Sequence, residues 1–171
     1  MSTALLIHVT GLAALGLNVV ALACTCERSL RLRSGAAGII WALNNFLLGS
    51  HAAAALSVVS AGRTATSAVT LNAAGQLRCA AFVAFMTLTS MIGVLTWNGV
   101  PTLVMTAASL LSTYAMFHMT GRVLRWMMLL VSVMWMLNAW IYGSWEQMAA
   151  NVLSAGACMM GVRRVGRGAR Q

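Results

Sequence analysis

The sequence predicts an all-α integral membrane protein with seven transmembrane helices, and three observations carry this prediction. Hydrophobic residues make up 60% of the 171 residues, and charged residues make up only 8%. Soluble domains contain about 25% charged residues, so this chain has too few to cover a water-facing surface. The apolar residues are gathered into seven runs, each near the length that crosses a bilayer, and none has the alternating pattern of a barrel strand.

The seven runs give the expected helices in order. A hydrocarbon core about 30 Å thick needs about 20 helical residues, and about 17 are enough. Short turns separate the runs at Gly49-Ser50, at Asn98-Gly99 before Pro101, and at Gly143-Ser144. The expected segments are Thr3–Ala23, Ser34–Leu48, Ala52–Leu71, Cys79–Trp97, Thr102–His118, Val123–Tyr142 and Gln147–Val162.

The placement of the arginines predicts the orientation of the chain. Ten of the 11 arginines lie after the first, third and fifth segments or in the C-terminal tail, and the other connections hold none. Such an excess is typical of cytoplasmic loops. We therefore expect the N-terminus outside, the C-terminus inside, and anionic inner-leaflet lipids at the arginine clusters. Nucleic-acid binding is disfavoured, because no soluble basic domain is present to carry it.

The N-terminal segment has a second interpretation as a cleaved signal peptide, which would leave six helices. A signal peptide begins with a basic region, and residues 1–7 contain no Lys or Arg. The segment is therefore expected to be a retained membrane helix.

The chain repeats itself at an offset of 94 residues. Seventeen of 51 positions are identical without a gap when residues 12–62 are aligned with residues 106–156, and Trp41 then matches Trp135. Each copy holds three helices, and a single helix between them restores the direction of the chain. The prediction is a 3+1+3 arrangement of parallel repeats, related by a pseudo-twofold axis along the membrane normal, as in SWEET-type transporters. A duplicated structural bundle without a pathway is the alternative.

This arrangement divides a single membrane domain that covers residues 1–171. The parts are a first three-helix repeat, a linker helix that inverts the chain, a second three-helix repeat and a basic cytoplasmic tail. Their expected bounds are 1–71, 72–97, 98–162 and 163–171.

Several short motifs resemble one family over nearly the whole chain. They are Asn45-Phe-Leu-Leu-Gly49, Arg63-Thr64, Ser112-Thr-Tyr-Ala-Met-Phe117, Gly121 with Arg125, and Trp135 through Gly143-Ser144. In these motifs the chain resembles the bacterial inner-membrane proteins of the YgjV type. That family distantly resembles the SWEET, PQ-loop and nicotinamide-riboside transporters, which implies a small-solute carrier. SWEET-type proteins carry hinge prolines in the first two helices of each triple, whereas this chain has only Pro101.

The ionisable residues predict that the protein is not an enzyme and binds no metal or other cofactor. The chain has no Asp, and Glu27 and Glu146 are expected at opposite faces of the membrane. The three histidines fall in an outer half-helix, an outer turn and an inner helix end, where they cannot converge on one metal. Thirteen methionines are expected to fill gaps or face lipid, and a copper pathway is the alternative.

Arg63 is the only charged residue deep inside an expected helix, since Arg125 lies in the first turn of its segment. Counting from the preceding turn places it about 18 Å deep at 1.5 Å per residue. A charge there costs about 2.5–3.5 kcal/mol on insertion scales unless it faces protein or water. Either Arg63 reaches the inner interface or bonds helix carbonyls, or it lines a central cavity and binds an anionic or carbonyl-rich solute.

The remaining candidate residues are polar or aromatic repeat mates. Asn44 and Asn138 each share a helix face with the tryptophan three residues earlier, and Ser57 is the mate of Asn151. The amides either join helices or meet near the pseudo-axis to bind a ligand. The candidate solute-binding residues are therefore Arg63, Asn44, Asn138, Trp41, Trp135, Ser57 and Asn151, with Asn45 and Asn18 as weaker members.

Two functions fit these observations. The first is a facilitative carrier of a small polar solute, sugar- or nucleoside-like, at the interface of the two repeats. Its transport is expected to be uncoupled, because proton and sodium coupling usually use an intramembrane Asp or Glu. The second is a non-transporting membrane scaffold or partner-binding protein. A cavity lined by Asn44, Asn138 and Arg63 would favour the carrier, and a dry interface packed with Trp41 and Trp135 would favour the scaffold.

Overall fold

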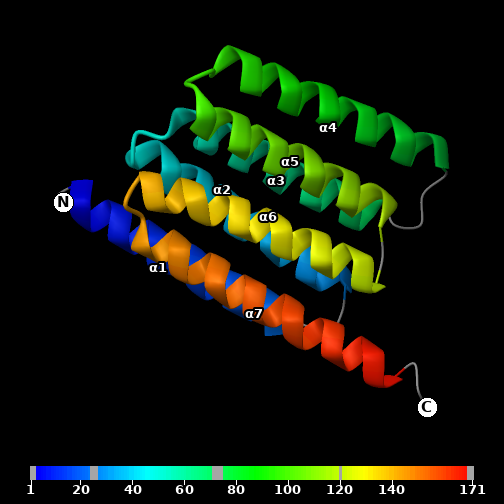
Figure 1. Ribbon diagram of the computed structural model, residues 1–171. Coiled ribbons are helices and arrows are strands. Elements are labelled where there is room, and N and C mark those ends of the chain that lie inside the picture. The colour runs from blue at the N-terminus through cyan, green and yellow to red at the C-terminus, as the bar shows by residue number, and fades with distance from the viewer. Residues whose placement is uncertain (1–2, 24–26, 71–74, 120, 169–171) are drawn as a thin grey trace.

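The protein is a bundle of seven α-helices that run alongside one another (Figure 1). The structure is a computed structural model, and it describes residues 3–23, 27–70, 75–119 and 121–168. The helices are α1 (Thr3–Ala23), α2 (Glu27–Leu47), α3 (His51–Val69), α4 (Gly75–Leu95), α5 (Val100–His118), α6 (Gly121–Ile141) and α7 (Trp145–Gly168). The predicted all-helical class and the number of helices are confirmed.

The predicted bounds are wrong where arginines flank an apolar run. α2 begins at Glu27 rather than Ser34, so Arg28, Arg31 and Arg33 lie on the helix and not in a loop. α7 continues to Gly168, so most of the expected 163–171 tail is helical, and residues 169–171 lie outside the described part. Arginine is a good helix former, and hydropathy marks only the part of a helix that faces hydrocarbon.

Three glycine turns lie at one end of the bundle, which we call the glycine end. Gly49, Gly99 and Gly143 connect α2 to α3, α4 to α5 and α6 to α7, and their φ angles are 79°, 76° and 66°. Glycine adopts this left-handed region without a steric penalty. At the opposite end, which we call the arginine end, α2 and α6 begin at positions rich in arginine.

The turns after α2 and α6 have the same backbone hydrogen bonds. The amide of Ser50 donates to the carbonyl of Asn45 at 2.9 Å, and the amide of Ser144 donates to the carbonyl of Ala139 at 2.9 Å. The amides of Gly49 and Gly143 donate to carbonyls three residues earlier, at 3.0 and 3.2 Å. Each pair of bonds is separated by the 94-residue offset of the sequence repeat.

Six of the helices close a ring in the order α1, α2, α3, α5, α6, α7, because each packs against the next and α7 packs against α1. α4 lies outside this ring against α3 and α5, at the edge of the bundle in Figure 1. We call α1–α3 the first half and α5–α7 the second half. The halves meet at two places, the α1–α7 junction and the α3–α5 junction.

The interior of the bundle is about half polar, and its exterior is rich in large apolar side chains. Among the described residues, 19 buried residues are polar or charged and 20 are hydrophobic, whereas large apolar side chains are exposed on every helix. Within the part of the chain that the structure describes, four helices are long and apolar enough to cross a membrane, namely α1, α4, α5 and α6. α2, α3 and α7 carry more polar residues, and α3, with eleven buried residues, is enclosed by its neighbours α2, α4 and α5.

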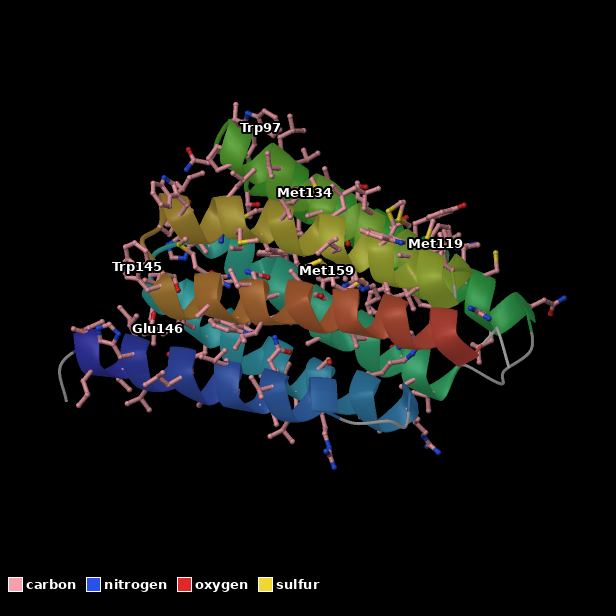
Figure 2. The ribbon with its side chains drawn as sticks, turned by 60° about the horizontal axis from the view of Figure 1, so that its bottom comes forward. Trp97, Met119, Met134, Trp145, Glu146 and Met159 are labelled. Carbon is pink, nitrogen blue, oxygen red and sulfur yellow. The ribbon has the colours of Figure 1, made fainter. Side chains whose placement is uncertain are left out.

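Exposed tryptophans mark the glycine end. Trp97 and Trp145 lie near this end in Figure 2, and Trp97, Trp140 and Trp145 are each more than 60% exposed. Tryptophan is enriched where hydrocarbon meets the lipid headgroups. These side chains therefore indicate the level of one membrane interface.

Candidate functional site

Arg63 joins the two halves at the α3–α5 junction. Its Nη1 donates to the carbonyl of Ser109 and to the hydroxyl of Thr113, both on α5 and both at 2.9 Å. Its Nη2 donates to the hydroxyl of Ser60, one turn earlier on α3, at 2.6 Å. The side chain is only 2% exposed. The guanidinium therefore lies inside the protein and does not reach the arginine end.

Among the described residues, the guanidinium of Arg63 donates only to neutral acceptors. The chain has two carboxylates, Glu27 and Glu146, and Arg63 forms no ion pair with a described residue. Its Nε and the hydroxyl of Ser109 have no hydrogen-bond partner within the described part of the chain. Burying a charge without an ionic partner is costly in free energy, so burying the guanidinium of Arg63 costs more than burying an arginine paired with a carboxylate.

Arg31 is a second buried arginine, and it was not expected in the interior. Its side chain is 3% exposed, and its Nη1 donates to the hydroxyl of Ser67 on α3 at 3.1 Å. Ser67 lies one helical turn beyond Arg63. The sequence signal for this position was its place one and two turns before Gly35 and Gly38, on the face of α2 that packs closely against α3.

The α1–α7 junction holds an ion-pair contact that the sequence interpretation missed. Nδ1 of His8 on α1 lies 2.5 Å from Oε1 of Glu146, at the start of α7 near the glycine end (Figure 2). Gly11, one turn after His8, leaves the space that Glu146 occupies, because a Cβ there would lie 2.9 Å from the Cβ of Glu146. The available signal in the sequence was Gly11, three residues after His8, because a residue without a side chain leaves room for a neighbouring helix.

Asn44 joins α2 to α1 within the first half. Its Nδ2 donates to the carbonyl of Ile7 at 2.7 Å and to the hydroxyl of Thr10 at 3.0 Å. The side chain is fully buried, and its Oδ1 has no partner among the described residues. The donor group of Asn44 therefore holds two neighbouring helices together.

Asn138 has a different environment from its repeat mate. Neither of its amide atoms has a hydrogen-bond partner in the described residues, although the side chain is only 2% exposed. It forms part of the wall of a pocket of about 210 Å³ between α5 and α6. Asn44 and Asn138 are therefore not hydrogen-bonded to each other, and α2 and α6 are not neighbours in the ring.

The two tryptophan candidates lie in apolar clusters at the two junctions. Trp41 packs with Ala14 of α1 and Ala150 of α7. Trp135 packs against a cluster that contains Leu56 of α3 and Met105 of α5. Each indole therefore lies between small or apolar side chains of both halves.

The other candidates form local bonds. The hydroxyl of Ser57 accepts a hydrogen bond from Nδ2 of Asn45 at 3.3 Å, which joins α3 to α2. Nδ2 of Asn151 donates to the carbonyl of Gln147 in its own helix at 3.0 Å. Asn18 is partly buried on α1. The structure thus places Arg63, Trp41 and Trp135 at the junctions. It bonds Asn44, Ser57 and Asn151 within one half, so the predicted residues are not gathered around one cavity.

No group of three His, Cys, Asp or Glu side chains within the described residues has the spacing of a metal site. Outside the predicted set, His8 and Glu146 join the two halves, whereas Arg31 and Thr10 join helices within the first half.

The comparison with protein families matches residues 5–168 to a family of bacterial inner membrane proteins, Imp-YgjV. No curated protein and no solved structure matches the chain. The match covers nearly all of α1–α7 and agrees with the apolar exterior of the bundle. The chain therefore belongs to the Imp-YgjV family of bacterial inner membrane proteins.

Proposed function

We propose that the protein is a facilitative carrier of a small polar solute and that the structure is its closed conformation. The observation that carries this proposal is the set of ten buried polar atoms without a hydrogen-bond partner among the described residues. Buried polar groups are nearly always bonded to protein or to ordered water. The unpaired atoms within the ring, such as those of Asn44, Asn138 and Arg63, are groups that water or a polar solute can pair with when the halves separate.

The proposal includes two parallel three-helix repeats with α4 as the linker. Three observations support it: the 94-residue sequence offset, the equivalent turns after α2 and α6, and the ring in which α1–α7 and α3–α5 are equivalent contacts. Trp41 and Trp135 also pack against repeat mates, because Ala150 of one cluster corresponds to Leu56 of the other. Two halves with two small junctions can move relative to each other.

The junctions themselves are suited to separation. Arg63 and the His8–Glu146 pair are polar contacts between the halves that water or solute can replace. We propose that the glycine end faces the periplasm and the arginine end faces the cytoplasm, because the arginines are concentrated at the latter. We further propose uncoupled transport, since the α3–α5 junction has no carboxylate contact to Arg63.

The test is solute entry into liposomes that contain the purified protein. Swelling is followed by light scattering in iso-osmotic glycerol, ribose, xylose, glucose and uridine. We expect at least one solute to enter faster than into protein-free liposomes, without dependence on a proton gradient. The control is a His8→Cys/Glu146→Cys variant, cross-linked with a short thiol reagent in a background without the four native cysteines.

The cross-link decides whether the halves move. Entry should stop when α1 and α7 are joined and return when the cross-link is reduced. Entry that equals that of protein-free liposomes for every solute would reject the carrier. Entry that persists in the cross-linked protein would reject a path that opens at the α1–α7 junction.

A non-transporting scaffold is the second candidate, because Trp41 and Trp135 pack in apolar clusters at the two junctions. This function requires no opening of the interior. A cysteine at Ser57, in the same cysteine-free background, separates the two. Modification by a charged thiol reagent in membranes favours the carrier, and complete protection favours the scaffold.

A further inference from the structure

Four buried donor groups without hydrogen-bond partners lie where α3, α4 and α5 meet. α4 packs against both α3 and α5 at this corner of the bundle (Figure 1). The groups are the Nε of Arg63 and the hydroxyls of Thr89, Thr106 and Ser109, and none has a partner among the described residues. All four can donate a hydrogen bond, so the corner is rich in free donors.

Two contacts between α4 and α5 set the level of Thr89. Four residues before it, the ring of Phe85 stacks on that of Phe117, with the centroids 6.4 Å apart. Four residues after it, Gly93 adjoins Thr106, because a Cβ on Gly93 would lie 2.5 Å from the hydroxyl oxygen of Thr106. α4 and α5 are antiparallel, so Thr89 lies level with the middle of the α5 segment between these contacts. Thr89 is fully buried on a helix that is otherwise mostly exposed, so its side chain lies in the corner.

The guanidinium of Arg63 lies at the same level. It donates to the carbonyl of Ser109, which belongs to this segment of α5. The residue before it, Gly62, adjoins α4, because a Cβ there would lie 3.7 Å from Cε1 of Phe85. Arg63, Thr89 and Ser109 are therefore in one layer of the bundle, each contributed by a different helix.

The hydroxyls of this layer differ from those around them. Serine and threonine in helices can bond a carbonyl three or four residues earlier, and Thr64, Ser112 and Thr113 do so at 2.7–3.1 Å. The hydroxyls of Thr89 and Ser109 form no such bond, although these residues are only 0% and 1% exposed. Leaving buried donors unpaired costs free energy, so these groups require an acceptor that the described chain does not supply.

The charge of the layer decides which acceptor fits best. Arg63 is 2% exposed and forms no ion pair with a described residue. Glu146, one of the two carboxylates of the chain, contacts His8 at the other junction. A water molecule would leave the positive charge of Arg63 unbalanced, whereas an anion accepts hydrogen bonds from the donors and also balances the charge. The donors are almost fully buried, so the anion is small.

We propose that this layer binds one chloride or similarly small monovalent anion, held by the Nε of Arg63 and the hydroxyls of Thr89 and Ser109. Thr106, one turn before Ser109 on α5, borders the site. The anion is a resident counter-ion of Arg63 and not a transported solute. The proposal does not depend on transport, so it and the carrier proposal can fail separately.

The test is thermal unfolding of the detergent-solubilised protein in sodium chloride, sodium bromide or sodium gluconate at one ionic strength. Gluconate is too large for the enclosed layer and serves as the reference anion. At about ten times its Kd, chloride should raise the Tm above the value in gluconate by about 3–6 °C. Bromide should act as chloride does. Equal Tm values in chloride and gluconate would overturn the proposal.

Single substitutions locate the anion. Ser109→Ala and Thr89→Val each remove one donor and should weaken the Kd for chloride at least about tenfold, because a hydrogen bond to a charged group is lost. Arg63→Met should abolish the effect of chloride. Ser132→Ala is the matched control and should leave the Kd unchanged, because the hydroxyl of Ser132 is already bonded to a carbonyl of its own helix at 2.9 Å.

The two hydroxyl variants decide the test even if Arg63→Met does not fold. An effect of chloride that is equal in the wild type, in Ser109→Ala and in Thr89→Val would overturn the proposal, because the anion would then bind elsewhere, such as at the arginine end.

Discussion

Asn44 and Asn138 each lie five residues before a left-handed glycine in equivalent turns, yet only Asn44 has hydrogen-bond acceptors. Asn44 donates to α1 through a carbonyl and a hydroxyl, whereas both amide atoms of Asn138 are unpaired among the described residues. One side chain contributes to the difference, since Thr10 of the first half corresponds to Val104 of the second. Asn138 also lacks the bond to the carbonyl of Pro101 that would match the bond of Asn44 to Ile7. The two halves are therefore alike in their backbone turns and unlike in how tightly their first two helices are joined.

Val104→Thr should stabilise the protein. The new hydroxyl would stand toward Asn138 as Thr10 stands toward Asn44, and interhelical bonds in membranes contribute about 0.6 kcal/mol on average. Thr10→Val should destabilise it by about the same amount, since Asn44 keeps only the carbonyl of Ile7. Chemical unfolding in detergent measures both. Val100→Thr, on the exposed rim of the pocket, is the control and should not stabilise.

Arg63→Lys should be more damaging than Arg63→Met. Lysine retains the buried charge but cannot reproduce the planar contacts to Ser109, Thr113 and Ser60 at once. Methionine removes both the charge and its burial cost, and such replacements are often neutral or stabilising. We expect a loss of about 1–3 kcal/mol for lysine, from the unpaired buried charge. Equal stability of the lysine variant and the wild type would contradict the structural role.

Gly93→Ala should push α4 away from α5. A Cβ at Gly93 would lie 2.5 Å from the hydroxyl oxygen and 2.6 Å from the Cγ2 of Thr106. Overpacking of this kind costs about 1–3 kcal/mol. Thr106→Ala removes both of these atoms, so the double variant should recover most of the lost stability. A double-mutant cycle of unfolding free energies measures the coupling, which should be near zero if the helices do not touch here.

The α1–α7 junction should depend on shape more than on charge. Glu146→Gln should cost less than about 1 kcal/mol, because His8 is 64% exposed and exposed ion pairs contribute little. Gly11→Val should cost more, since even a Cβ at this position approaches Glu146 to 2.9 Å. The Tm values of the two variants, each compared with Gly16→Val, test this order. Gly16 is the control because nothing lies within 4 Å of its Cβ position.

The helix count followed from the sequence because apolar length and glycine turns both mark helices in a membrane protein. The start of α2 and the end of α7 did not follow from the sequence, because arginines extend a helix beyond the hydrocarbon while they lower its hydropathy, so an apolar run stops before the helix does. The sequence identified Arg63 and the asparagines as candidate site residues, because a charged or polar side chain inside an apolar membrane helix costs free energy. The hydrogen-bond acceptors of Arg63 and Asn44 could not be predicted. Serine and threonine occur throughout the chain, and only the packing of the helices shows that Ser109, Thr113 and Thr10 face these donors.

Because α4 lies at the edge of the bundle, its length is set by the thickness of the membrane. Only Thr89 and Gly93 of its 21 residues are buried, so its composition is constrained by lipid on most of its circumference and by protein at few points. At 1.5 Å per residue it is about 32 Å long, close to the roughly 30 Å of a hydrocarbon core. When relatives from bacteria with thinner or thicker membranes are compared, the length of this helix should vary with the bilayer while the ring it adjoins keeps its dimensions.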